Sequence, residues 1–174
     1  MDENIYKRLA RHLDQLPGRF PSTDSGVELR LLRSIFTPEQ AELALHLTLS
    51  AEEAPVIAER AGLPVEQASR MLEEMANKGL IFDLQPRNGT QRYMASQFVV
   101  GIWEYQLNNL NPEFIHDADE YFKALFDFER WRKTPQPTLL RRPTAMKAAL
   151  QQGAHLRTTN FLTFSLLLAL SSAK

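Results

Sequence analysis

Apolar residues follow a helical period most clearly between Val65 and Lys78. They recur at steps of three, four and three residues, which places them on one face of a helix, at Val65, Ala68, Leu72 and Met75. We expect that face to pack against a core. A shorter helix is predicted just before it from a second apolar set, Val56, Ile57 and Ala61.

Glycine and proline punctuate both ends of the longer helix. Gly62 tolerates positive φ and Pro64 favours the first turn of a new helix, so the two helices are predicted to be joined by a tight turn and to cross steeply. Gly79 suits the left-handed position after a helix C-terminus, and the residues from Leu80 to Phe82 are typical of a strand.

A hairpin is predicted after this strand. Asn88-Gly89 lies between Phe82 and Tyr93, and this dipeptide is favoured in two-residue hairpin turns. Helix, turn, helix and hairpin follow one another in the order of a winged helix-turn-helix, in which the hairpin is the wing.

Two signals upstream extend this unit. Thr37 and Gln40 form a capping box that predicts a helix starting at residue 38. Leu47 to Leu49 fits a short first strand of the winged-helix sheet, and we expect Ser50 with Glu53 to cap the helix that follows it.

Flanking helices are predicted on both sides: from Asn4 to Leu16, from Val27 to Ile35, from Phe98 to Leu110 and from Pro112 to Phe128. The last of these places one set of apolar residues on one side, namely Phe114, Ile115, Ala118, Phe122, Leu125 and Phe126. The sequence therefore predicts a mainly α fold, a winged helix-turn-helix with a small antiparallel hairpin and additional flanking helices. Residues 1–129 would form this domain, and residues 130–174 a proline-broken basic tail with one or two short helices.

Several stretches of the chain share a family likeness: Tyr6 to Ala10, Leu16-Pro17, Phe20-Pro21, Ser25 to Leu29, Phe36 to Glu39, Ala41 to Ala44 and Phe98 to Gln106. Together they resemble the N-terminal domain of four-iron four-sulfur ferredoxin-type proteins, over the range from Tyr6 to roughly Pro137. In that family a winged-helix module precedes a cysteine-rich domain that binds the clusters. This chain has no cysteine, so the resemblance implies a module without the cluster-binding half, and no residue here is assigned to a cluster.

Composition excludes several kinds of site. With no cysteine among 174 residues, a disulfide, a thiolate zinc site and a thiol nucleophile are excluded. The spacing of the seven glycines excludes Rossmann and P-loop nucleotide sites. The four histidines are scattered, and the acidic residues after His116 are expected to point in different directions on a helix. We therefore expect no catalytic residue, no cofactor and no metal, and a protein that is not an enzyme.

Charge differs sharply between the two parts of the chain. The net charge is −1, but residues 20–100 hold seven basic and eleven acidic residues (7 − 11 = −4), whereas residues 130–174 hold eight basic residues and no acidic one. Side chains suited to base edges or phosphates lie on the longer helix and the wing, at Gln67, Arg70, Asn77, Arg87 and Arg92. Glu66, Glu73 and Glu74 on the same helix would repel phosphates.

The tail permits two interpretations. Its basic residues interleave with Trp131 and prolines, as in segments that bind nucleic acid by phosphate pairing and stacking. We favour instead a pairing of the tail with the acidic helix nearby, which bears Asp117, Asp119, Glu120, Asp127 and Glu129. The apolar run from Phe161 to Leu170 is too short to cross a bilayer. It is expected to pack on the domain or on a second copy, which would give a homodimer through the C-terminal helix.

The N-terminus carries charge where a signal peptide has an apolar segment, so a cytoplasmic location is expected. We expect a non-catalytic winged-helix module with a regulatory or protein-interaction role. Its partner would be another protein, or its own iron-sulfur domain if the chain is part of a longer one. The alternative is a winged-helix transcription regulator that binds DNA through the five residues named above.

Overall fold

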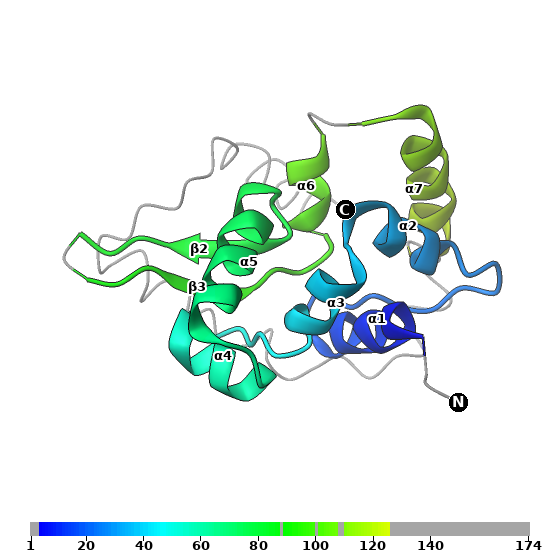
Figure 1. Cartoon of the computed structure of the whole chain (residues 1–174). Coiled ribbons are helices and arrows are strands. Elements are labelled where there is room, and N and C mark those ends of the chain that lie inside the picture. The colour runs from blue at the N-terminus through cyan, green and yellow to red at the C-terminus, as the bar shows by residue number, and fades with distance from the viewer. Residues whose placement is uncertain (1–3, 88, 100, 108–109, 126–174) are drawn as a thin grey trace.

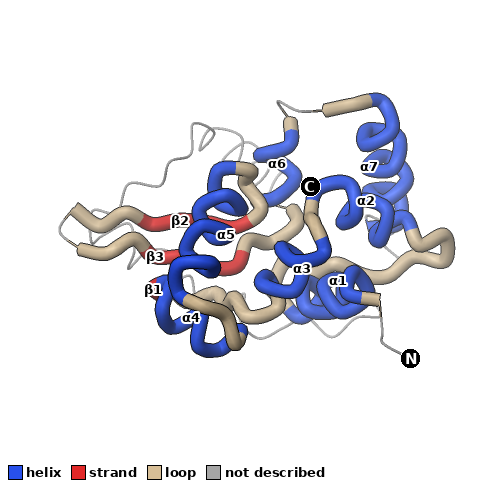
Figure 2. Tube along the Cα trace, viewed as in Figure 1, coloured by secondary structure: helices blue, strands red, loops and turns tan. Residues whose placement is uncertain are grey.

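The computed structural model describes residues 4–87, 89–99, 101–107 and 110–125 (Figure 1). Within these ranges the chain is mainly helical, with a small antiparallel sheet of three strands. The helices are α1 (Ile5–Gln15), α2 (Val27–Ile35), α3 (Pro38–Ala44), α4 (Ala54–Ala61), α5 (Val65–Asn77), α6 (Ile102–Gln106) and α7 (Pro112–Leu125). The strands are β1 (Glu52–Glu53), β2 (Ile81–Leu84) and β3 (Arg92–Ala95), in the order β1-β3-β2 (Figure 2).

The capping box predicted at the start of α3 is confirmed. The backbone N–H of Gln40 donates to Thr37 Oγ1, and the backbone N–H of Thr37 donates to Gln40 Oε1, each over 3.2 Å. These bonds satisfy two backbone donors that a helix N-terminus would otherwise leave unpaired. The boundary between α2 and α3 is thus fixed by local chemistry.

The first strand lies further along the chain than the sequence predicts. Leu47 to Leu49 is not a strand, although the carbonyl of Thr48 accepts a hydrogen bond of 2.7 Å from the backbone N–H of Ala95. The Thr48 hydroxyl instead accepts from the backbone N–H of Ser50 over 3.1 Å, a local bond that turns the chain. Ser50 therefore does not cap α4, which follows Glu53 directly.

The hairpin is confirmed, but its turn is longer than predicted. Strands β2 and β3 pair antiparallel from Ile81 opposite Ala95 to Leu84 opposite Arg92. Pairing stops there, so the connection runs over residues 85–91 rather than two residues. Pro86 lacks the N–H that a longer ladder would need at that position. Asn88 of the predicted turn lies outside the described residues.

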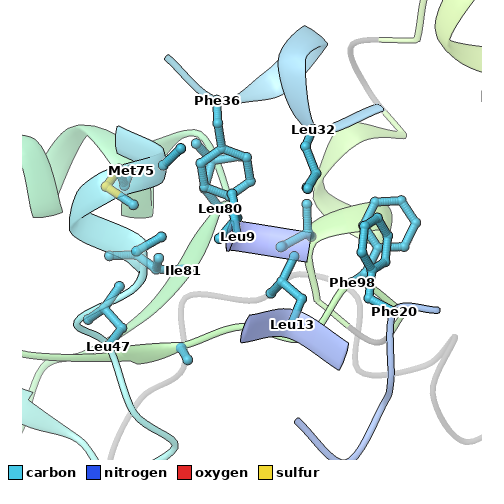
Figure 3. Packing of buried hydrophobic residues seen from close by; sticks show 14 of the residues in the cluster. Leu9, Leu13, Phe20, Leu32, Phe36, Leu47, Met75, Leu80, Ile81 and Phe98 are labelled. Atoms are coloured by element: carbon cyan, nitrogen blue, oxygen red, sulfur yellow. The ribbon is translucent and has the colours of Figure 1, made fainter. Parts of the chain in front are cut away.

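A single hydrophobic cluster joins the N-terminal helices to α5, the sheet and α7 (Figure 3). Leu9 and Leu13 of α1 lie near its centre together with Leu80, all buried. At one side Phe20 packs on Phe98, with ring centroids 4.7 Å apart.

The apolar stripe of α5 is confirmed except at its first residue. Ala68, Leu72 and Met75 are completely buried. Val65 is 41% exposed, because it begins the helix directly after the turn and lies at the edge of the core. Gly79 follows α5 with φ +69°, and a Cβ there would lie 2.1 Å from Cβ of Tyr105. Glycine is required at this position for both reasons.

The helix predicted from Phe98 to Leu110 is wrong. Among its described residues only Ile102–Gln106 is helical, because Gln97 and Gly101 form a bridge that turns the chain first. A Cβ on Gly101 would lie 2.0 Å from Ser96 Oγ, so this close turn depends on glycine.

Helix α7 ends at Leu125 in the described chain, and the predicted extension to Phe128 lies outside it. Phe114, Ala118 and Leu125 are buried as predicted, but Ile115 is 48% exposed, so its placement on the buried side is wrong. The buried stripe runs through Tyr121 instead, which packs on Phe20.

Residues 130–174 lie outside the described residues, and with them the predicted tail helices. No helix in the described ranges is both long and apolar enough to span a membrane.

Candidate nucleic-acid interface

Helices α4 and α5 are joined by a tight turn. Gly62 ends α4 with φ +66°, and the backbone N–H of Leu63 donates to the carbonyl of Ala58 over 3.0 Å. Ile57 of α4 and Leu72 of α5 are both completely buried, so the two helices share one core. This packing fixes which side of α5 faces solvent.

Arg60 ties α4 to the strand before it. Its Nη1 donates to Glu52 Oε2 over 3.0 Å and to the carbonyl of His46 over 2.6 Å. The hydrogen bonds from Arg60 lower the pKa of the Glu52 carboxyl. Arg60 of α4 therefore has a structural role within the fold. The sequence did not indicate this role.

The three predicted base-reading residues of α5 lie on its solvent side. Gln67, Arg70 and Asn77 are all exposed. Arg70 lies one turn from Gln67 and two turns from Asn77, so the three side chains share one side of the helix. The structure therefore brings these three predicted residues together, while their role in binding DNA stays a prediction.

The glutamates of α5 surround Arg70. Glu66 and Glu74 lie four residues before and after it, and Glu73 lies three residues after it, which are the spacings of neighbours on a helix surface. All three are exposed, and none forms an ion pair with another residue in the described part of the chain. The exposed side of α5 is therefore acidic around its one central arginine.

The two predicted wing residues differ in their surroundings. Arg87 is exposed in the loop of the hairpin. Arg92 begins β3, opposite Glu53 of β1, and its Nη2 donates to Glu53 Oε1 over 3.4 Å. Glu53 offsets the charge of Arg92, so Arg92 is less available to a phosphate than Arg87.

Two carboxylates, Asp83 of the hairpin and Glu73 of α5, act on the buried Tyr93. Asp83 is paired with Tyr93 across the sheet, and Asp83 Oδ2 accepts a hydrogen bond of 3.0 Å from Gln91. Burial raises the pKa of the Tyr93 hydroxyl, and the negative charges of Glu73 and Asp83 raise it further. One carboxylate from α5 and one from the hairpin thus lie near the same tyrosine. Sequence analysis missed this feature because it depends on the strand register.

A group with metal-ligand character lies on α7. Ligand atoms of His116, Asp117 and Glu120 all lie within 4.8 Å of one another, contrary to the expectation that they point in different directions. Both carboxylates accept hydrogen bonds from Arg30 of α2, each with a contact of 2.9 Å from Nη2. The guanidinium of Arg30 therefore already occupies these carboxylates, and the group is part of the contact between α2 and α7.

The same bonds bear on the interpretation of the tail. Asp117 and Glu120 pair with Arg30, and Asp119 accepts a hydrogen bond of 2.6 Å from Lys123. Three of the five carboxylates predicted to pair with the basic tail thus already have basic partners, and the other two, Asp127 and Glu129, lie outside the described residues.

Comparison with known proteins gives no further assignment. No protein-family model, curated protein or solved structure matches this chain.

Proposed function

We propose that the described residues form a winged helix-turn-helix module that acts through protein contacts rather than by reading DNA. The order of α4, tight turn, α5 and antiparallel hairpin supports the winged-helix assignment. The role is non-catalytic and regulatory, as the resemblance to the N-terminal domain of ferredoxin-type proteins implies.

The acidic side of α5 carries this proposal. In a winged-helix DNA reader the second helix enters the major groove and lies between two phosphate backbones. Here Glu66, Glu73 and Glu74 flank Arg70 without ion-pair partners among the described residues. Phosphate binding draws its free energy from counterion release by basic residues, so these carboxylates oppose it.

The same surface suits a partner of opposite charge. Exposed glutamates on a rigid helix can form charge-assisted hydrogen bonds with arginine or lysine on another protein. The resemblance makes a cluster-binding domain in a longer chain one such partner. A second protein with a basic surface is the other.

Fluorescence anisotropy of the full chain against duplex DNA tests the proposal. The DNA set comprises a random duplex and fragments from upstream of its own gene, titrated at several salt concentrations. We expect no fragment to be preferred, and we expect Arg70→Ala to give the same titration curve as the wild type.

The basic tail requires a matched variant in this assay. Any non-specific binding that arises from the tail should weaken in Arg132→Ala and not in Arg70→Ala. Preferred binding to one fragment that is lost in Arg70→Ala would reject the proposal and support the transcription-regulator alternative.

A further inference from the structure

A cleft opens where the ends of four elements meet, on a different part of the surface from the solvent side of α5. Its volume is about 320 Å³, near the lower end of the range for small-molecule sites. It lies between the C-terminal ends of α2 and α5, helix α6 and the start of α7. Its lining residues are Ser34, Ile35, Lys78, Leu80, Gln106, Asn111 and Phe114.

One part of the cleft is apolar and firmly held. Leu80 and Phe114 are buried, and Ile35 packs against the same core. Trp103 stacks on Phe114 with ring centroids 5.7 Å apart and planes inclined by 19°. A flat or short apolar group could rest against this wall without any change in the core.

Hydrogen bonds orient the polar groups of the cleft. Gln106 Nε2 donates to the carbonyl of Lys78 over 3.0 Å, which joins α6 to the end of α5. Asn111 Oδ1 accepts from the backbone N–H of Phe114 over 2.8 Å. The oxygen of the Asn111 amide is therefore used, and its NH₂ group is the part left to donate to a ligand.

Among the described residues that line the cleft, Lys78 alone is charged. It has no ion pair among the residues that the structure describes. Its four-carbon side chain is flexible enough to bring the ammonium group to a ligand in a space of this size. A cation and an amide donor beside an apolar wall favour an anion that carries a small apolar group.

We propose that this cleft binds a small carboxylate with a short apolar body, of roughly ten non-hydrogen atoms. The apolar body packs on Leu80 and Phe114, and the carboxylate accepts hydrogen bonds from Lys78 and Asn111. Such a ligand would bridge the end of α5 to α6 and α7. The site goes beyond the proposed function, because it needs neither a protein nor a DNA partner.

Fluorescence of Trp103 provides the test, because this residue stacks on the wall of the cleft. The protein is the full chain with Trp131→Phe, which leaves Trp103 as its only tryptophan. Phenylacetate is the probe, and phenylacetamide is its neutral counterpart of similar shape. We expect a saturable change with phenylacetate and affinity about tenfold lower for phenylacetamide, the loss typical of one charge-assisted contact.

Two lysine variants separate the site from general charge effects. Lys78→Gln should weaken phenylacetate binding about tenfold. Lys123→Gln removes a cation from α7 that pairs with Asp119 outside the cleft, and it should leave binding unchanged. The proposal is overturned by the absence of a saturable change at about 10 mM phenylacetate, a concentration that reveals even weak small-ligand sites. Equal affinity for the two probes, or equal effects of the two variants, would overturn it as well.

Discussion

Helices α5 and α7 each bury one apolar stripe and carry several carboxylates on the other side. In α7, Asp117 and Glu120 pair with Arg30, and Asp119 pairs with Lys123. In α5 the exposed glutamates have no such partners in the described part of the chain. Three of the four carboxylates of α7 are thus paired within the fold, all but Glu113, whereas the glutamates of α5 present their charge to solvent.

The difference separates a structural acidic surface from one available for contacts. Composition alone makes both helices acidic, and the tail was expected to pair with α7. Arg30 of α2 instead pairs with two of the α7 carboxylates, Asp117 and Glu120. An acidic helix can therefore be assigned to the fold or to an outside partner only when the residues facing it are known.

The largest expected effect on stability comes from truncating a side chain in the buried apolar stripe of either helix. Leu72→Ala in α5 should lower the free energy of unfolding by about 3 kcal/mol, and Tyr121→Ala in α7 by about 4 kcal/mol, because both remove completely buried side chains. Val65→Ala and Ile115→Ala are the matched exposed controls and should change it by less than about 0.5 kcal/mol. Urea denaturation measures all four. A large loss in either control would contradict the observed burial.

An effect no larger than that of Leu72→Ala is expected where α5 is joined to the rest of the fold. Gly79→Ala should cost about 3 kcal/mol, because it adds the clash with Tyr105 to the strain of positive φ. Gly62→Ala in the turn before α5 has nearly the same φ, +66° against +69°, but nothing within 4 Å of its added Cβ, so about 1 kcal/mol is expected. Thermal unfolding of both variants separates the cost of the clash with Tyr105 from the cost of positive φ. Equal losses would mean that the contact with Tyr105 relaxes freely.

The smallest effect sharpens the contrast in charge. Arg30→Ala removes the partner of two α7 carboxylates and should lower the melting temperature by a few degrees at low salt. Arg70 has no ion pair among the described residues, so Arg70→Ala deprives no carboxylate of a partner and should have no measurable effect on the melting temperature. Since ion pairs at the surface are screened, the difference should shrink at about 0.5 M salt. Equal melting temperatures for the two variants at low salt would remove the distinction drawn between the helices.

The parts of the fold that depend on local chemistry were predictable from the sequence. The capping box at Thr37, the left-handed Gly79 and the buried face of α5 each follow from residues close together in the chain. The start of the first strand and the start of the helix after Phe98 were not predictable. The first involves a contact between residues distant in the sequence, Thr48 and Ala95, and the second depends on a close turn in which Gly101 lies against Ser96 and Gln97.

The candidate site was predictable only in part. The helical period placed Gln67, Arg70 and Asn77 on one exposed side, together with the glutamates that surround Arg70. The pairing of Arg92 with Glu53 required the strand register. The cleft beside Lys78 is lined from three parts of the chain that are distant in the sequence, around residues 34–35, 78–80 and 106–114, and no local pattern indicates it.

The most direct test reverses the charge on the exposed side of α5. Anisotropy with random duplex DNA at about 50 mM salt, where non-specific phosphate contacts are strong, compares the wild type with Glu73→Lys/Glu74→Lys. Glu59→Lys/Glu113→Lys changes the net charge equally on α4 and α7 and is the control. We predict at least tenfold tighter, salt-sensitive binding for the α5 variant and little change for the control. An α5 variant that binds no better than the wild type, or a control that gains as much, would contradict the claim that these glutamates keep α5 off DNA.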